Sequence, residues 1–279
     1  MRKLLQTPVM KNNLNVIALG AGVQSSTMAF MAAHGEIKPM PDAAIFADVG
    51  AEPDEVMDYF DYLEDELPFP VYKVMDGDGL TKNVELAVRS GKTFYSPPFF
   101  TKDKDGDVGI LGRQCTRRFK IVPIKKKIRE MLGLKPGQRV SKDTRVTQWM
   151  GISLDEIQRL RESRDKWIEF RYPLVDMRMR RGDCIEWMRR NGYPEPPRSA
   201  CVYCPYHDNK AWRKIKMTDA NAWDEAVRVD RLIRPGIEKS TTDFYLHQSG
   251  LPLDEVDFSN DFDRGQLSFL DECEGLCGV

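Results

Sequence analysis

The sequence has little of what marks an exported or a membrane protein. No apolar run approaches the roughly 20 residues that span a bilayer. Residues 1–13 begin with basic side chains but lack the apolar centre and the small-residue cleavage site of a secretory signal. The net charge is −1, so no overall basic field indicates nucleic acid as a partner. We therefore expect a cytoplasmic protein that does not bind membranes.

Cysteine is also scarce, with six residues in a chain of 279. In a chain without an export signal the thiols stay reduced, so metal ligation or catalysis is favoured over disulfide bonds. The hydrophobic fraction of 41% and the charged fraction of 30% are ordinary for a protein with a buried core. The length suits one large domain, or one domain with an appended helical part.

Short apolar runs alternate with stretches that favour helix. Strands are predicted at residues 14–19, 42–47, 71–75 and 144–152, and helices at 27–34, 54–67, 121–132 and 181–191. Such alternation predicts an α/β fold, with a doubly wound, mostly parallel sheet joined by right-handed crossovers. Residues 76–112 are rich in Gly, Pro, Lys and Asp and are interpreted mostly as an inserted surface loop or lid.

A glycine- and serine-rich loop follows the first predicted strand, reading Gly20-Ala21-Gly22-Val23-Gln24-Ser25-Ser26. A strand that ends in small residues and opens a helix presents unpaired backbone N–H groups, and the helix dipole favours a phosphate there. The loop is neither a Walker A loop nor GxGxxG. A tight turn capped by serine accounts for the same residues, so the loop by itself leaves both interpretations open.

The loop resembles the PP-loop, whose usual form after the first strand is Ser-Gly-Gly-x-Asp-Ser. Gln24 stands where ATP-splitting members carry aspartate, and Val23 stands where many carry lysine. A Gly-x-Gln version is found in phosphoadenylyl-sulfate (PAPS) reductases, which bind a nucleotide without cleaving ATP. The departure puts ATP cleavage in doubt, although not nucleotide binding.

Further segments follow in the order of that family, at residues 46–53, 114–123, 149–152, 162–164, 172–174 and 183–187. The chain is therefore identified as resembling the PAPS reductase-like branch of the PP-loop superfamily. The resemblance implies a nucleotide-binding α/β domain over residues 14–215, and residues 216–279 then form a C-terminal helical extension with a cysteine-bearing tail. The implied nucleotide-binding residues are Gly20, Ala21, Gly22, Gln24, Ser25, Ser26, Asp48, Gly50, Arg118, Lys120, Gly151, Arg161 and Arg164. The arginines and the lysine are chosen because such groups suit sulfate and phosphate, with surface solvation as the alternative.

Cys201 and Cys204 form a CxxC pair on a predicted turn, a spacing that suits one metal ion or a redox dithiol. Related adenylyl-sulfate reductases hold a [4Fe–4S] cluster with a tandem Cys-Cys and a distant CxxC, and here Gln114-Cys115 occupies the tandem position. The resemblance thus implies a cluster on Cys115, Cys201 and Cys204, either open at one iron or closed by a tail cysteine. The alternative is zinc, with His207 completing a Cys₃His set.

The last two cysteines, Cys273 and Cys277, lie in the tail. PAPS reductases end in a Glu-Cys-Gly-Leu-His segment whose thiolate attacks the substrate sulfur, so the resemblance makes these two the catalytic candidates. A frayed terminus with incidental thiols is the alternative. Cys184, beside Ile185 and Trp187, is expected to be a core residue.

Two hypotheses about function follow. The first is an enzyme that binds an adenine nucleotide, either ATP or an adenylyl sulfate, and carries out sulfur transfer or reduction at a cysteine-ligated metal centre. The resemblance adds a nucleic acid or a ribonucleoprotein to the candidate partners, while the electron or sulfur donor stays unidentified. The second hypothesis is a non-catalytic nucleotide-binding accessory protein with a structural metal.

Overall fold

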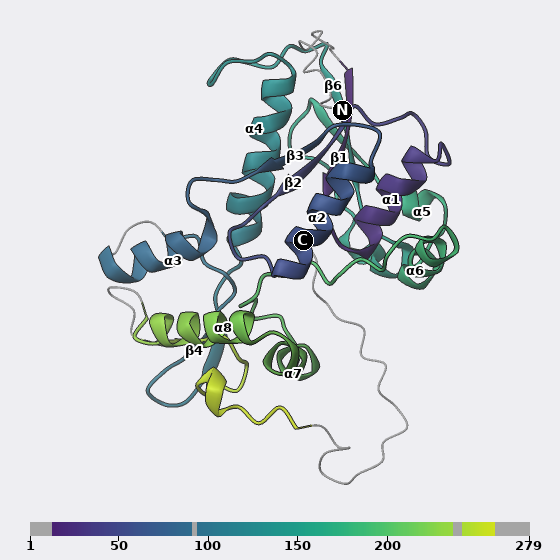
Figure 1. Cartoon of the computed structure of the whole chain (residues 1–279). Coiled ribbons are helices and arrows are strands. Elements are labelled where there is room, and N and C mark those ends of the chain that lie inside the picture. The colour runs from purple at the N-terminus through teal and green to yellow at the C-terminus, as the bar shows by residue number, and fades with distance from the viewer. Residues whose placement is uncertain (1–12, 91–93, 237–241, 260–279) are drawn as a thin grey trace. The chain divides into compact units, whose positions relative to one another are not determined.

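The computed structural model describes residues 13–90, 94–236 and 242–259 (Figure 1). These residues form two compact units, each drawn from separate stretches of the chain. Unit 1 contains residues 13–48, 54–75 and 121–199, and unit 2 contains residues 49–53, 76–120 and 200–259 within the described ranges. The division therefore differs from the domain boundary predicted at residue 215.

Unit 1 is built on a five-stranded sheet. Its strands are β1 (Asn13–Leu19), β2 (Ala43–Ala47), β3 (Val71–Val74), β6 (Arg145–Met150) and β7 (Ile168–Arg171), in the order β3-β2-β1-β6-β7. Every neighbouring pair is parallel. The predicted α/β fold with a parallel sheet is confirmed, and each predicted strand is present within a few residues of its expected bounds.

The central strand β1 is buried on both faces. Val16 and Ile17 are both fully buried but belong to two different core clusters, because successive side chains of a strand point to opposite faces. Parallel strands covered on both sides read as continuous apolar runs, which is why residues 14–19 and 43–47 carry almost no polar side chains.

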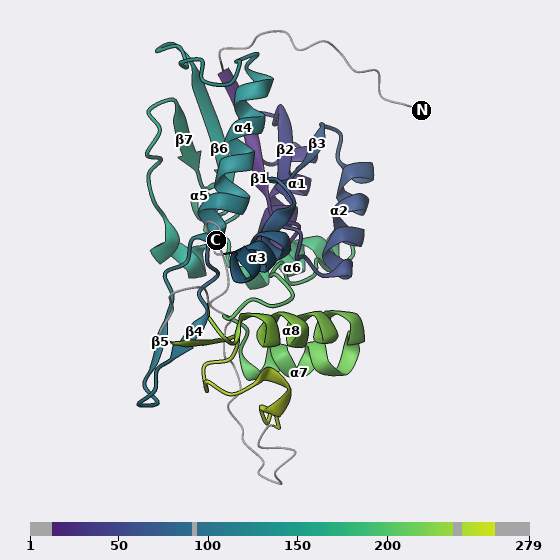
Figure 2. The same cartoon turned by 90° about the vertical axis from the view of Figure 1, so that its left-hand side faces the viewer.

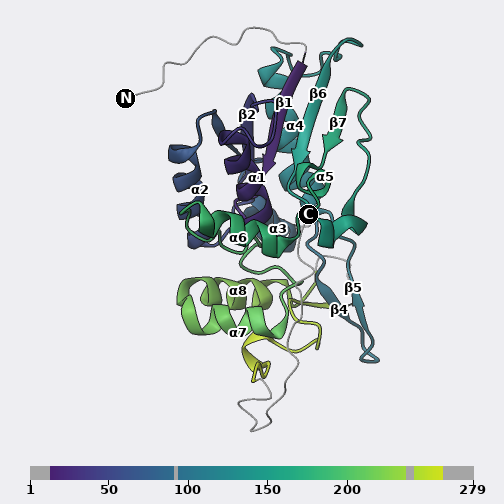
Figure 3. The same cartoon turned by 90° about the vertical axis from the view of Figure 1, so that its right-hand side faces the viewer.

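Helices cover both faces of this sheet (Figures 2 and 3). One face carries α1 (Val23–Ala33), α2 (Asp54–Glu66), α5 (Pro173–Asp176) and α6 (Arg181–Arg190). The other face carries α4 (Val122–Met131), whose Ile124 and Ile128 pack with Val16 and Ile45. A short 3-10 segment, Leu154–Arg159, follows β6.

The sheet has a switch point between β1 and β6. From β1 the chain proceeds outward through β2 and β3, and it then returns past β1 to β6 and β7 on the other side. Right-handed crossovers in opposite directions place their helices on opposite faces. In open sheets of this kind, ligands bind beyond the carboxyl ends of the strands at the switch point. The fold thus directs attention to the loops that follow Leu19 and Met150.

Unit 2 combines helices with a small antiparallel sheet. Its helices are α3 (Gly79–Ser90), α7 (Asn209–Thr218) and α8 (Ala220–Ile233), with a π-helical turn at Thr116–Ile121 and a 3-10 turn at Leu253–Glu255. The strands β4 (Phe100–Lys102), β5 (Val108–Ile110) and β8 (Asp243–Tyr245) form a sheet in the order β5-β4-β8. Helices α7 and α8 lie side by side (Figure 3).

The structure corrects the interpretation of residues 76–112 as mostly loop. Helix α3 occupies residues 79–90 and the β4–β5 hairpin follows it. Leu80, Val84 and Ala87 are spaced to fall on one helical face, and all three are buried. The segment as a whole is rich in Gly, Pro and Asp, so its composition predicts a loop although Leu80, Val84 and Ala87 have helical spacing.

Within the described ranges, no helix is long and apolar enough to cross a membrane. Cys184 on α6 is fully buried in the unit 1 core, as expected from its apolar neighbours. Burial raises the pKa of Cys184 to about 12, and the nearby carboxylates of Asp155 and Asp183 act in the same direction.

We therefore expect Cys184 to resist alkylation in the native protein. At about pH 8 its thiolate fraction, and with it the rate of labelling by iodoacetamide, should be at least about a thousandfold below that of an ordinary thiol. Peptide mass spectrometry measures this rate, with the urea-unfolded chain as the control. Equal rates in the native and unfolded protein would contradict the buried placement.

Candidate functional site

The loop after β1 leads directly into helix α1. Gly22 is the N-cap residue of that helix, with an extended backbone and no side-chain cap, and the first turn carries no acidic residue. The Ser25 hydroxyl accepts from the Gly20 N–H at 3.1 Å and lies 3.3 Å from the Gly22 carbonyl, to which it donates. Ser25 therefore shapes the loop, while the first N–H groups of the helix, which have no partners within it, face an uncapped end. Such an end attracts an anion.

Gly151, the first residue after β6, lies against this loop. A Cβ atom at position 151 would lie 2.7 Å from Ser25 Cα and 2.8 Å from Ser25 N. Both are backbone atoms, so only glycine fits at position 151 without a shift of the Ser25 backbone. Because β1 and β6 are neighbours in the sheet, their carboxyl ends meet here. The structure thus brings together Gly151 and the Gly20–Ser26 loop, which the sequence had placed in one site.

Gln24, the residue that departs from the ATP-splitting pattern, is held by polar side chains of unit 1. Its Nε2 lies 3.4 Å from Ser153 Oγ and 3.3 Å from Glu156 Oε2 and donates to both. Its Oε1 accepts from Arg181 Nη1 at 3.1 Å. The other carboxylate oxygen of Glu156, Oε1, forms an ion pair with Arg159.

Sequence reasoning missed these partners. Ser153, Glu156 and Arg181 follow no periodic pattern or motif that marks them as neighbours of the loop. These three residues lie 129 to 157 positions from Gln24 in the sequence, so only the fold brings them next to the glutamine.

Other predicted nucleotide-binding residues of unit 1 have mixed placements. Ser26 is fully buried in the first turns of α1. Asp48 follows β2 directly, and its N–H donates to the Val74 carbonyl at 2.9 Å. Arg161 and Arg164 are exposed, and the backbone of Arg161 bonds to the Tyr172 hydroxyl through both its N–H and its carbonyl.

The remaining predicted residues belong to unit 2, among them Gly50, Arg118 and Lys120 and the four predicted metal ligands. Arg118 forms an ion pair with Asp76, Nε to Oδ2 at 2.7 Å. Lys120 Nζ lies 3.4 Å from Oε1 of Glu52, whose side chain is 1% exposed. Both cations are therefore already paired with carboxylates, and Glu52 is a charged residue of this region that sequence reasoning did not select.

The segment that follows β2 is held through its backbone. The carbonyls of Val49 and Ala51 accept from the N–H groups of Leu80 at 2.7 Å and Val202 at 2.8 Å. Gly50 has a φ of +69°, and a Cβ there would lie 3.3 Å from Gly79 Cα. Glycine is needed at position 50 for the positive φ and for this close approach.

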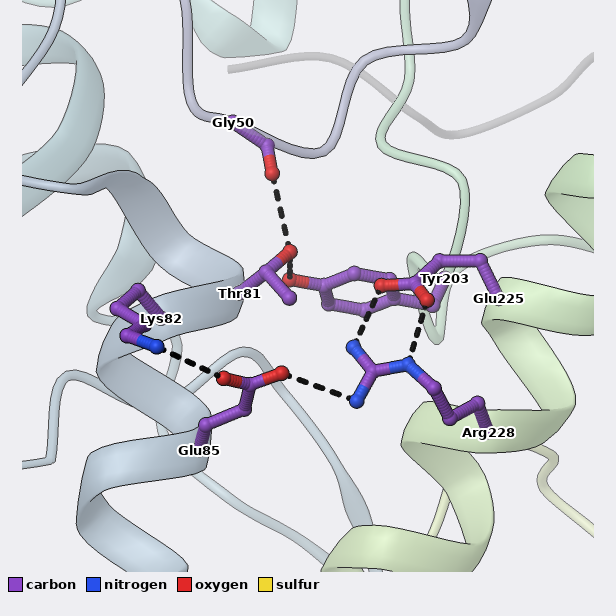
Figure 4. A network of polar contacts seen from close by, with 7 residues as sticks. All are labelled: Gly50, Thr81, Lys82, Glu85, Tyr203, Glu225 and Arg228. Atoms are coloured by element: carbon purple, nitrogen blue, oxygen red, sulfur yellow. Dashed lines mark hydrogen bonds and ion pairs between the residues drawn. The ribbon is translucent and has the colours of Figure 1, made fainter.

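Side chains complete the same arrangement (Figure 4). The Thr81 hydroxyl donates to the Gly50 carbonyl at 3.0 Å and also lies 2.8 Å from the hydroxyl of Tyr203, one of the two residues between the cysteines of the CxxC pair. Arg228 bridges Glu225 and Glu85 beside them. The cysteine turn is therefore fixed to α3 and α8 and to the segment after β2, all within unit 2.

Cys115 and Cys201 are protonated thiols at neutral pH. Burial raises the pKa of Cys115, against the opposing effect of Arg113. Burial also raises the pKa of Cys201, and the Glu52 carboxylate adds to the effect. Burial opposes the charge on Lys120, but the pKa of this amine is raised because Glu52, Cys201 and Cys115 together outweigh desolvation. Lys120 thus acts on both thiols, while its partner Glu52 acts on Cys201.

The predicted metal ligand His207 makes contacts of its own in this arrangement. His207 Nε2 lies 2.9 Å from the Cys201 carbonyl, so this nitrogen is engaged in closing the turn. The His207 ring packs edge-on against Trp212, with centroids 4.8 Å apart. Among residues 13–90, 94–236 and 242–259, no three His, Cys, Asp or Glu side chains come together as ligands. The iron–sulfur and zinc hypotheses therefore stay predictions of the resemblance. Cys273 and Cys277 lie outside the described residues.

Comparison with known proteins finds likeness to solved structures but not to family models or curated sequences. No family model matches the chain, and no curated protein matches it. The crystal structure of phosphoadenylyl-sulfate (PAPS) reductase from Candida auris, in a phosphate complex, is similar with a TM-score of 0.42 and 13% identity. The match covers 67% of this chain and 75% of that one. At this level the likeness carries no argument about the site, so the fold class rests on the strand order described above.

Two glycine substitutions test the contact between β6 and the loop. Gly151→Ala should lower the free energy of unfolding by about 1–3 kcal/mol, because the new methyl group overlaps the Ser25 backbone. Gly182→Ala is the matched control, since a Cβ there meets nothing within 4 Å, and it should leave stability unchanged or raise it by up to about 1 kcal/mol. Urea unfolding measures both. Equal effects of the two changes would show that the close approach at Gly151 is wrong.

Proposed function

We propose that unit 1 binds an adenine nucleotide, either ATP or an adenylyl sulfate, with its phosphate or sulfate groups at the Gly20–Ser26 loop. The observation that carries the proposal is the uncapped start of α1 at the switch point between β1 and β6. Small residues at positions 20, 21 and 22 let oxygen atoms approach the N–H groups, and the helix dipole favours negative charge. The PP-loop resemblance of the same residues supports adenine as the base.

We further propose that the chain is a PAPS reductase-like enzyme that transfers or reduces sulfur. In favour of this are the thiols of Cys115 and Cys201, which share a charged environment with Lys120 and Glu52. Lys120 favours the thiolate form of Cys201, whereas burial and the Glu52 carboxylate oppose it more strongly, so this thiol reacts only where a ligand changes that balance. The tail cysteines Cys273 and Cys277 stay candidates for the attacking thiol. No metal is needed for this proposal, and a nucleic-acid substrate stays a prediction of the resemblance.

A non-catalytic accessory protein is the competing function, and one observation favours it. Gln24 is engaged by Ser153, Glu156 and Arg181, so its amide is occupied at the position where ATP-splitting relatives carry a carboxylate. An amide cannot hold a magnesium ion as a carboxylate does. Nucleotide binding without turnover is the behaviour that this alternative predicts.

Titration calorimetry of the full-length protein with ATP and adenylyl sulfate tests nucleotide binding. Wild type should bind at least one of the two, and Gly22→Val should reduce the affinity at least about tenfold, because a side chain there blocks the approach of phosphate to the N–H groups. A Cβ at Gly22 would lie 3.2 Å from Ser199 Cβ, so circular dichroism must confirm that the variant folds. Gly182→Ala serves as the control. Undiminished binding by a folded Gly22→Val protein would refute the loop as the phosphate site.

A further inference from the structure

A second segment of unit 1 lies on the glycine loop, at Pro197, Arg198 and Ser199. A Cβ built at Gly22 would lie 3.2 Å from Ser199 Cβ and 3.9 Å from the Pro197 carbonyl oxygen, and one built at Gly20 would lie 3.7 Å from Ser199 Oγ. The residues on either side of Arg198 thus contact the start of the loop. Two prolines, Pro196 and Pro197, precede Arg198 and restrict the backbone that presents it.

Arg198 has a buried nitrogen that lacks a partner. Its Nη2 is inaccessible to solvent and makes no hydrogen bond among the described residues. A guanidinium group is always charged and carries five N–H donors. A donor of this kind that is removed from water without an acceptor destabilises the protein, so buried charged donors normally have an anionic partner.

Two independent features, in segments that contact each other, therefore call for negative charge. One is the uncapped start of α1, with no acidic residue in its first turn. The other is the buried Nη2 of Arg198, in the segment that contacts the same loop. Neither feature depends on the other, because one belongs to the strand-to-helix connection after β1 and the other lies some 175 residues further along the chain.

We propose that Arg198 is an anion-binding residue, which holds a tetrahedral phosphate or sulfate group of the ligand over the Gly20–Ser26 loop. The proposal rests on the proposed nucleotide site and adds the residue that selects for a charged group there. The planar guanidinium donates two parallel N–H bonds to such a group, while the N–H groups of the loop bind its other oxygens. The site therefore discriminates a nucleotide from its uncharged nucleoside.

Thermal unfolding with inorganic phosphate or sulfate as the probe tests the residue without reference to any nucleotide. In the absence of either anion, Arg198→Met should unfold at the same temperature as wild type or a higher one, because the change removes a buried donor that has no partner. Added phosphate or sulfate should raise the unfolding temperature of wild type and of the exposed control Arg190→Met, and should leave Arg198→Met unchanged. If Arg198→Met unfolds earlier than wild type by the same amount with and without the anions, the arginine has a structural role only and the proposal is overturned.

Titration calorimetry then separates this inference from the proposed function. With ATP, Arg198→Ala should weaken binding about ten- to a hundredfold, the range expected for hydrogen bonds to a charged group. Arg198→Lys should recover part of the loss, because an ammonium group keeps the charge but not the fork. Adenosine should bind wild type and Arg198→Ala equally. Equal loss for ATP and adenosine would overturn the role of Arg198 while leaving nucleotide binding intact. If wild type binds no nucleotide but phosphate still stabilises it through Arg198, the anion site stands and the nucleotide proposal fails.

Discussion

The contact between Gly151 and the backbone of Ser25 is the constraint on which the candidate site depends. It joins the ends of β1 and β6, the two strands between which the sheet changes direction. With a side chain at position 151, the first turn of α1 would have to move away from β6, and the loop would lose its shape. The hydroxyl of Ser25 then bonds to both Gly20 and Gly22, so one residue transmits the position of the sheet to the loop. The N-cap residue of α1 is Gly22, which has no side chain to cap the helix, so an anion can occupy the start of α1.

In unit 2, three consecutive backbone carbonyls fix the segment after β2 by accepting hydrogen bonds from other parts of the unit. Val49, Gly50 and Ala51 each accept a hydrogen bond, from α3 or from the cysteine turn. The following residue, Glu52, pairs with Lys120 at a buried position. Lys120, which was expected to bind an anion of the ligand, thus has a carboxylate partner within the protein, and its role in binding the ligand stays a prediction. A lysine whose charge is already balanced by a buried carboxylate has little attraction left for a phosphate.

The fold was predictable from sequence because its signals are local. Apolar runs at residues 14–19 and 43–47, each followed by helical periodicity, are sufficient to predict a parallel sheet. Helix α3 was missed because its three buried residues lie among glycines and charged residues, where composition outweighs periodicity. For the site, Gly20, Gly22, Ser25 and Gly151 were selected correctly as neighbours, since they follow strands whose carboxyl ends meet. The partners of Gln24 and the pairing of Glu52 with Lys120 arise from contacts between distant parts of the chain, which leave no spacing to detect.

The central claim is that an anionic nucleotide binds at the start of α1. Amide hydrogen exchange, measured by mass spectrometry with and without ATP, tests this most directly, because it reports where protection appears. The account predicts slower exchange in peptides that cover residues 20–26 and 197–199, with the exposed end of α6 near Arg190 unchanged. Protection confined to other segments, with no change at the glycine loop, would contradict it.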